Sequence, residues 1–244
     1  MKGIASIALG TLAIAAAPMW AQAQAPAPPG SPSKPQRLSD ERTLSRWAYA
    51  NDRVHARRKP DSGSKAVGRL RYETEDGYPE IYLALRSAFD SKGAEWVLIR
   101  LPMRPNGTVG WVPRSALDKF HAVRTFLDID RKRLRATLYR NGKKVFSAPV
   151  GVGKSSTPTP PGNFWIRERL RNLGGGGIYG PLAFGTADYS VLSDWPGGGV
   201  IGIHGTNQPG LVPGRPSHGC IRMHNSDIVH LDKLMSVGTP LRVR

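Results

Sequence analysis

Cys220, the single cysteine of the chain, lies among residues that can activate a thiol. His204 and His218 lie within sixteen positions of it, and Arg222 follows two positions later. A thiol is mostly protonated near neutral pH and becomes a nucleophile when a base or a nearby cation favours the thiolate. The pattern predicts a cysteine nucleophile with His204 as its general base. The structural alternative is a buried, inert cysteine that packs as a small hydrophobic residue.

The residues around the thiol are spaced to share one side of an extended segment. His218, Cys220 and Arg222 occupy alternate positions, and alternate side chains of a strand point the same way. His204 would come from the end of a separate strand, as the members of catalytic triads usually do. The backbone N–H groups of Gly219 and Cys220 are the predicted donors of an oxyanion hole.

The elements that must position these residues are predicted to be mostly strands over residues 121–244. Asn141-Gly142 between two apolar runs is a strong hairpin signal. A helix is expected after an Asn225 or Ser226 cap, with a buried stripe of apolar residues. That stripe consists of Ile228, Leu231, Leu234 and Met235. The glycine-rich residues 171–180 suit a mobile loop or lid.

The first half of the chain divides into three predicted parts. Residues 1–25 have a basic start, a short apolar run and A-x-A cleavage sites, which predicts a secretory signal peptide and no stable membrane span after cleavage. Residues 26–46 are a proline-rich linker. Residues 47–117 alternate short apolar runs with turns, which predicts a small β-barrel.

The chain carries a formal net charge of +17. Such a balance favours a polyanionic partner. The basic residues are scattered and no nucleic-acid motif is present, so nucleic acid is not the expected partner. With the predicted export signal, an anionic cell envelope is the expected partner, and the expected location is the periplasm or cell wall. A solvated basic surface is the plain alternative.

Two ordered motifs make residues 121–244 resemble the L,D-transpeptidase (YkuD-like) catalytic domain. The first joins His204-Gly205-Thr206-Asn207, Ser217-His218-Gly219-Cys220-Ile221-Arg222 and Asn225. The second, residues 157–164, is similar to a Thr-Pro-x-Gly-x-Phe strand of that family. Residues 47–117 resemble a bacterial SH3-like domain in their Val-His-Ala strand and in residues 106–112. The implied fold is mainly β: a transpeptidase-type sandwich with one C-terminal helix, preceded by a small SH3-like barrel.

The resemblance implies a peptidoglycan L,D-transpeptidase that needs no cofactor or metal. Cys220 would attack the carbonyl between the third and fourth residues of a stem peptide, form a thioester and release D-Ala. A neighbouring stem would then supply the amine for a 3→3 cross-link. The carbonyl of Gly205 would orient His204, and Ser217 and His218 would shape the site. Arg222 would hold a donor carboxylate or polarise its carbonyl.

Other functions remain open from the sequence. Water in place of the acceptor amine would give an L,D-carboxypeptidase, and a protein amine would give attachment of a protein to the wall. A non-catalytic wall-binding protein is the alternative outside enzymes. The acceptor, the third stem residue, the ligand of the SH3-like domain, the oligomeric state and retention of the signal as an anchor are left undecided.

Overall fold

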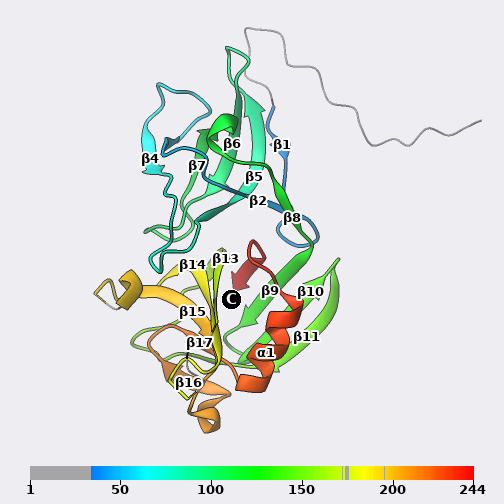
Figure 1. Ribbon diagram of the computed structural model, residues 1–244, viewed down its shortest axis with the longest axis vertical. Coiled ribbons are helices and arrows are strands. Elements are labelled where there is room, and N and C mark those ends of the chain that lie inside the picture. The colour runs from blue at the N-terminus through cyan, green and yellow to red at the C-terminus, as the bar shows by residue number, and fades with distance from the viewer. Residues whose placement is uncertain (1–33, 172, 174–175, 195) are drawn as a thin grey trace, which may run out of the picture.

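The computed structural model describes residues 34–171, 173, 176–194 and 196–244. The predicted signal peptide, residues 26–33 of the predicted linker, and parts of the predicted glycine-rich lid lie outside these residues. The chain forms two lobes, each built on a β-sheet, and it crosses between them from β8 to β9 (Figure 1). The mainly-β prediction is therefore confirmed. Within the described part of the chain, no helix is both long enough and apolar enough to span a membrane.

An antiparallel eight-stranded sheet forms the N-terminal lobe. Its strands follow the order β4-β3-β7-β6-β5-β2-β8, with β1 paired to β5. The strands are β1 (Gln36–Arg37), β2 (Ser45–Tyr49), β3 (His55–Arg57), β4 (Ala66–Arg69), β5 (Ile81–Phe89), β6 (Glu95–Arg100), β7 (Val109–Pro113) and β8 (His121–Val123), with a 3₁₀ turn at η1 (Arg114–Ala116). The predicted strands near residues 53–56, 67–70, 81–85, 96–101 and 109–112 are all present.

The limits of the lobes differ from the predicted segments. β1 and the first residues of β2 fall inside the predicted linker of residues 26–46, because both strands pair with β5. β8 falls inside the predicted catalytic segment of residues 121–244, yet it pairs with β2. Hydrogen bonding between strands distant in sequence draws these residues into the N-terminal sheet, so the C-terminal sheet begins at Thr125.

The C-terminal lobe is a ten-stranded mixed sheet in the order β11-β10-β9-β18-β13-β14-β15-β17-β12-β16. Its strands are β9 (Thr125–Asp130), β10 (Arg135–Arg140), β11 (Lys143–Pro149), β12 (Gly151–Gly153), β13 (Gly162–Arg171), β14 (Leu182–Tyr189), β15 (Val200–His204), β16 (Gly214–Ser217), β17 (Ile221–Arg222) and β18 (Pro240–Val243). The other elements are the 3₁₀ turns η2 (Pro196–Gly199) and η3 (Pro209–Leu211) and the helix α1 (Asn225–Leu234).

The hairpin prediction is confirmed at β10 and β11. Asn141 and Gly142 both have positive φ, 51° and 75°, and Arg140 pairs with Lys143 across them. A two-residue turn with two positive φ angles matches the twist of the flanking strands, and Asn-Gly adopts it readily.

The helix prediction is confirmed, but the predicted cap is wrong. α1 begins at Asn225 with His224 at the N-cap position, and no side chain caps it. The side-chain oxygen of Asn225 instead accepts a hydrogen bond from the N–H of Thr206, at 2.8 Å. Ile228 and Leu231 are buried, as the apolar stripe predicts.

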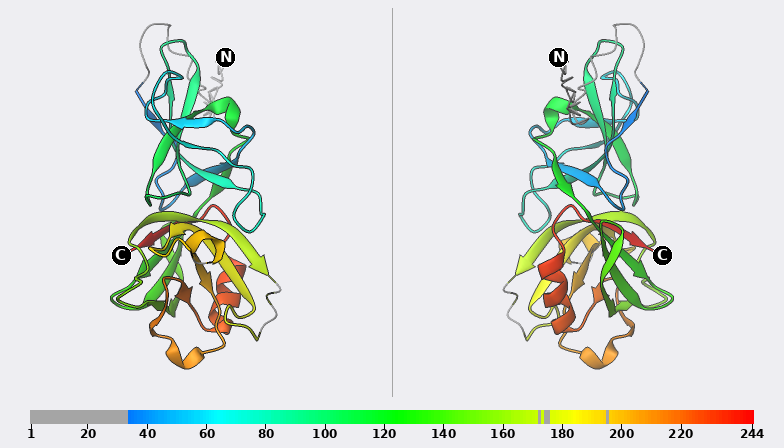
Figure 2. Two further views of the ribbon diagram at one scale, coloured as in Figure 1. Left: turned by 90° about the vertical axis from the view of Figure 1, so that its left-hand side faces the viewer. Right: turned by 90° about the vertical axis from the view of Figure 1, so that its right-hand side faces the viewer.

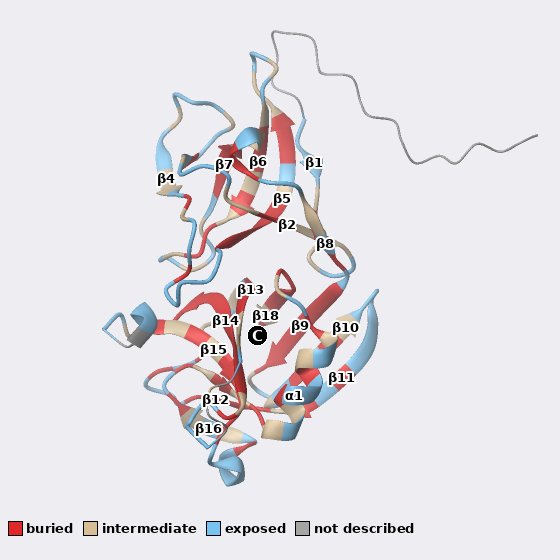
Figure 3. Cartoon of the chain, viewed as in Figure 1, coloured by how far each residue is buried: buried red, intermediate tan, exposed pale blue. Residues whose placement is uncertain are grey.

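The core runs through both lobes. Figure 3 shows buried residues along the central strands of both sheets. One apolar cluster joins Trp47, Ile81 and Leu83 of the N-terminal lobe to Leu127 and Trp165 of the C-terminal lobe. The indole N–H of Trp165 donates to the carbonyl of Ile81 at 3.2 Å. The lobes therefore share a packed interface, which fixes their relative orientation (Figure 2).

Candidate functional site

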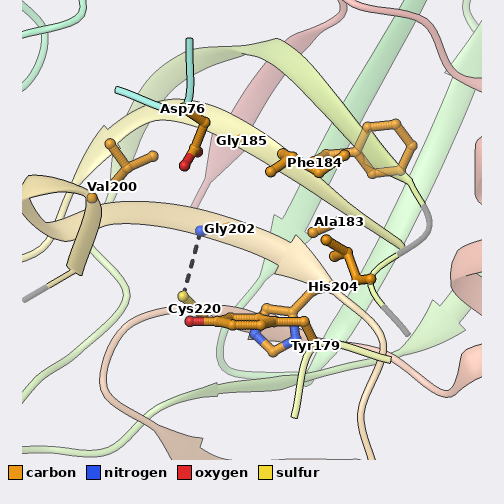
Figure 4. Close-up of a pocket in the computed structure, with 12 residues that line it drawn as sticks. Asp76, Tyr179, Ala183, Phe184, Gly185, Val200, Gly202, His204 and Cys220 are labelled. Atoms are coloured by element: carbon orange, nitrogen blue, oxygen red, sulfur yellow. Dashed lines mark hydrogen bonds between the residues drawn. The ribbon is translucent and has the colours of Figure 1, made fainter. Parts of the chain in front are cut away.

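The structure brings Cys220 and His204 to one cavity. Both line a hollow of about 210 Å³, here called the cysteine cavity. His204 is the last residue of β15, and Cys220 immediately precedes β17, which pairs in parallel with β15. Strand pairing therefore joins two sequence segments sixteen residues apart, and Figure 4 shows their side chains together. The described residues that line the cavity are Asp76, Leu170, Leu173, Tyr179, Ala183, Phe184, Gly185, Gly197, Val200, Gly202, His204 and Cys220.

The ring of His204 is held in one orientation. Its Nδ1 lies 2.6 Å from the carbonyl oxygen of Gly205. A carbonyl accepts only, so Nδ1 carries the proton and the neutral ring keeps Nε2 as its basic atom. Tyr179 packs edge-on against the ring, with the two ring centres 5.0 Å apart. From the sequence, Tyr179 could line the cleft, but aromatic residues pack more commonly in the core, so no role is predicted for it.

The bend at Gly205 depends on close packing. A Cβ at this position would lie 2.3 Å from Oδ1 of Asn225, the same oxygen that accepts the Thr206 N–H. A side chain at Gly205 would therefore displace Asn225 and the carbonyl that orients His204. Asn225 thus belongs to the support of the site, a role that its interpretation as a helix cap did not reveal.

Cys220 sits in a loop fixed by short hydrogen bonds. Ser217 Oγ donates to the Cys220 carbonyl at 2.5 Å and accepts the Gly219 N–H at 3.1 Å. Thr159 Oγ1 donates to the Gly219 carbonyl at 2.6 Å and accepts the Gly153 N–H at 2.9 Å. Gly219 has φ of +131°, a conformation that side chains rarely adopt.

Two sequence predictions about this loop need correction. The Gly219 N–H, predicted as an oxyanion donor, is already bound to Ser217 Oγ, because the loop folds back on that side chain. Residues 218–219 form a bend rather than one continuous strand, since β16 ends at Ser217 and β17 begins at Ile221. The Cys220 N–H stays a prediction.

The bend places the predicted neighbours His218 and Arg222 at a second hollow beside the thiol. His218 is exposed, and its Nε2 lies 3.1 Å from Lys154 Nζ. It does not line the cysteine cavity but lines a smaller second hollow of about 50 Å³ together with Arg222. This second hollow adjoins the cysteine cavity, since Cys220 and His204 line both. Arg222 Nη1 donates to Gln208 Oε1 at 3.0 Å, whereas its buried Nε has no hydrogen-bond partner among the described residues.

The acid–base pair is uncharged before substrate binds. Burial lowers the pKa of His204 to about 4; the hydrogen bond to Gly205 opposes this shift and Arg222 adds to it. Burial raises the pKa of the Cys220 thiol, although the Gly202 N–H, 3.4 Å from Sγ, and Arg222 act in the opposite direction. The arrangement suits a neutral thiol beside a neutral imidazole that takes its proton during attack.

The cavity holds a cysteine thiol and a histidine ring, the two groups that a cysteine nucleophile and its base require. Among the described residues, no three His, Cys, Asp or Glu side chains lie close enough together to hold a metal ion. A backbone N–H and a guanidinium both favour the anionic form of the thiol. The site can therefore carry out acyl transfer from a carbonyl that reaches Sγ.

Comparison with known proteins finds a matching family model and similar proteins for the C-terminal lobe. The family model for the L,D-transpeptidase catalytic domain, YkuD, matches residues 124–243. Bacillus subtilis YkuD, which bears the name of an L,D-transpeptidase, is 38% identical over 107 residues, covering 44% of this chain and 58% of that protein. Bacillus subtilis YqjB, named likewise, is 36% identical over 97 residues, or 37% of this chain and 54% of that protein. The chain thus spans little more than half the length of these curated relatives.

A solved structure of the catalytic domain of an Enterococcus faecium L,D-transpeptidase has a TM-score of 0.37 and 25% identity. The match covers 49% of this chain and 96% of the solved chain. The family model and the curated relatives together support an L,D-transpeptidase catalytic domain of the YkuD type over residues 124–243.

Proposed function

We propose that this protein is an exported peptidoglycan L,D-transpeptidase that forms 3→3 cross-links through a thioester on Cys220. The observation that carries the proposal is the meeting of Cys220 and His204 in one cavity, with His204 Nδ1 bound to the Gly205 carbonyl. That bond directs the basic Nε2 away from the backbone, as a general base requires.

The first half of the reaction acylates the enzyme. As Cys220 Sγ attacks the carbonyl that joins the third stem residue to the fourth, His204 Nε2 takes the thiol proton. The new C–S bond replaces the C–N bond to the terminal D-Ala, and His204 returns the proton to the departing amine. The Cys220 N–H is the proposed oxyanion donor, and Arg222, whose cationic side chain lines the second hollow, would hold a donor carboxylate.

The second half transfers the acyl group. An amine of another stem peptide attacks the thioester and forms the new amide bond, and the C–S bond breaks. The amine proton passes through His204 to the departing thiolate, which restores Cys220. Ser217 and Thr159 support this chemistry by holding the loop on which Sγ sits.

The N-terminal lobe is proposed to be an SH3-like domain that contacts the cell wall, by analogy with its predicted fold. The signal-like residues 1–25 support export to the periplasm or cell wall. The net charge of +17 fits attraction to an anionic envelope.

Intact-protein mass spectrometry tests the chemistry. The mature enzyme and its Cys220→Ala variant are each mixed with a disaccharide-tetrapeptide. We expect an adduct equal to the donor minus D-Ala on the wild type and none on the variant. Cross-linked dimer among the released products would support transpeptidation, tripeptide alone would indicate an L,D-carboxypeptidase, and acyl transfer to an added protein would indicate attachment to the wall. A folded wild type that forms no adduct with several donors would refute the proposal in favour of wall binding.

A further inference from the structure

A loop of the N-terminal lobe enters the wall of the cysteine cavity. Residues 71–80, here called the interlobe loop, connect β4 to β5 and turn at Gly77, whose N–H donates to the Thr74 carbonyl at 3.2 Å. Asp76, at the tip of this loop, lines the same cavity as Cys220. Figure 4 shows its carboxylate pointing toward the strand that carries Gly202. The cavity is therefore built by both lobes.

The residues just before Asp76 are anchored to the C-terminal lobe. The hydroxyl of Thr74 donates to Glu168 of β13. Glu75 forms an ion pair with Arg167 at 2.9 Å and accepts a hydrogen bond from the Tyr189 hydroxyl at 2.7 Å. These contacts fix the loop from both β13 and β14, so Asp76 is presented to the cavity from a held backbone. A preorganised charge costs a ligand less to engage than one on a free loop.

Asp76 gives the cavity its charge. It is the sole Asp, Glu, Lys or Arg among the described residues that line this hollow. Burial keeps His204 and Cys220 neutral, since it lowers the pKa of the first and raises that of the second. Burial also raises the pKa of Tyr179, which keeps its hydroxyl protonated. The remaining lining is apolar side chains and glycine, so a cationic ligand group would meet one fixed opposite charge.

The carboxylate of Asp76 is available to a ligand. Asp76 is exposed, and no Lys or Arg in the described part of the chain forms an ion pair with it. The chain has 35 Lys and Arg against 18 Asp and Glu, so a surface carboxylate has many possible partners here. Its neighbour Glu75 does have such partners, Arg71 and Arg167.

We propose that Asp76 binds a primary ammonium group of the substrate in the cysteine cavity, and so makes the N-terminal lobe part of substrate selection. The inference rests on the proposed function. A stem peptide with a diamino acid at its third position offers such a group beside the bond that Cys220 attacks. Donor and acceptor stems both carry this chemistry, and the experiment separates them.

The test compares four combinations of enzyme and donor. The wild type and Asp76→Asn are each acylated with a disaccharide-tetrapeptide whose third residue has a free side-chain amine, and with the same donor N-acetylated on that amine. Acyl-enzyme formation is followed by mass spectrometry. We expect Asp76→Asn to lower the acylation efficiency about five- to tenfold with the free amine and to have little effect with the acetylated donor. Added salt should shrink the difference.

Glu73→Gln is the matched control, since Glu73 is exposed on the same loop and does not line the cavity. It removes the same charge and should leave both donors unchanged. If Asp76→Asn spares acylation but lowers the yield of cross-linked dimer relative to hydrolysis, the ammonium group belongs to the acceptor and the proposal stands.

Equal effects of Asp76→Asn on free and acetylated donors, with no change in dimer yield, would overturn the proposal. A wild type that forms no acyl-enzyme with either donor would instead refute the proposed function, so the two failures are distinguishable. Circular dichroism of each variant checks that the fold is kept.

Discussion

Two clusters of ionisable residues lie close together in this molecule and are organised in opposite ways. Between the lobes, Arg167 and Glu80 are fully buried. Both remain charged because each is paired with the opposite charge of the other. In the cysteine cavity, the buried His204 and the half-buried Cys220 form no ion pair among the described residues and stay neutral. Burial opposes charge in both places; the partners decide whether the charge survives.

In the interlobe cluster of Arg71, Glu75, Glu80 and Arg167, the positive and negative charges compensate one another. Arg167 contacts Glu80 and Glu75, and Arg71 contacts the same two carboxylates at 2.9 and 3.0 Å. Burial alone would raise the pKa of Glu75, but Arg167, the Tyr189 hydroxyl and Arg71 lower it to about 2. No side chain of the interlobe cluster needs to gain or lose a proton. In the cavity, a neutral pair leaves one proton free to transfer when substrate arrives.

The largest expected effect is on the transfer of the thiol proton from Cys220 to His204. His204→Ala should lower the rate of Cys220 acylation by at least about 10³-fold, because His204 is the sole histidine among the described residues that line the cysteine cavity. Single-turnover mass spectrometry with a tetrapeptide donor measures this rate. His55→Ala, an exposed histidine of the N-terminal lobe, is the control and should match the wild type. A loss below tenfold for His204→Ala would mean that the site works with a preformed thiolate.

Breaking the cluster between the lobes should chiefly cost stability. Arg167→Met leaves Glu80 buried without its bidentate partner and should lower the free energy of unfolding by about 3–5 kcal/mol. Urea denaturation followed by tryptophan fluorescence measures it. Arg171→Met removes an exposed pair with Asp232 and should cost at most about 1 kcal/mol.

The double variant Arg167→Met with Glu80→Gln sharpens the test. It removes the stranded carboxylate charge and should recover part of the loss. If the single and double variants were equally unstable, packing of the Arg167 side chain, and not charge compensation, would dominate the cluster.

The loop that carries the nucleophile offers an intermediate effect. Thr159→Val removes the donor to the Gly219 carbonyl and the acceptor of the Gly153 N–H. We expect kcat for acylation to fall about tenfold, with KM changed less, because the buried hydroxyl positions Sγ and touches no substrate. Thr159→Ser keeps the hydroxyl and should restore the rate. Equal losses for both variants would mean that the hydroxyl alone does not position Sγ.

Asp188 of β14 is a buried acid that forms no ion pair among the described residues, unlike the acids of the interlobe cluster. Burial raises its pKa from 3.8 to about 8, against the lowering effects of the Tyr189 N–H, the charge of Arg131 and the Asn106 side chain. Oδ2 has no hydrogen-bond partner among the described residues. Between about pH 4 and 8, the folded state therefore keeps a proton that the unfolded state has already released. As the pH rises through this range, the free energy of unfolding falls.

Asp188→Asn should remove that pH dependence. Oδ1 would still accept from Asn106, and the amide cannot ionise. We expect a gain of about 1–3 kcal/mol in the free energy of unfolding at pH 8, and almost none at pH 4. Urea melts at both pH values measure it, with the exposed Asp118→Asn as control. A variant that loses stability at pH 8 would show that Asp188 is held as a favourable carboxylate.

The smallest expected effect is on the acid side of the rate profile. Since the pKa of His204 is lowered to about 4, nearly all of its ring is in the basic form above about pH 5. Acylation efficiency should reach half of its maximum only when the pH falls to about 4. Circular dichroism at each pH separates this change from unfolding. A midpoint near the ordinary value of 6.5 would mean that the ring is less buried in solution than the structure has it.

By itself the sequence determined the parts that local chemistry controls. The Asn141-Gly142 turn, the apolar stripe of α1 and most strands follow from short-range backbone preferences and periodicity. The pairing of Cys220 with His204 was predictable because residue types and a known motif carry it.

Only the tertiary structure decided what depends on contacts between distant segments. Thr159 lies in the predicted Thr-Pro-x-Gly-x-Phe strand, but its hydrogen bond to the Gly219 carbonyl arises from sheet order. The places of Tyr179 and Asp76 at the cavity likewise depend on sheet order and on the docking of one lobe on the other. Asn225 was misread as a cap for the same reason: its partner, Thr206, is nineteen residues away. Burial, too, is a property of the folded core, so the neutral state of His204 and the charged state of Glu75 could not be predicted from residue type.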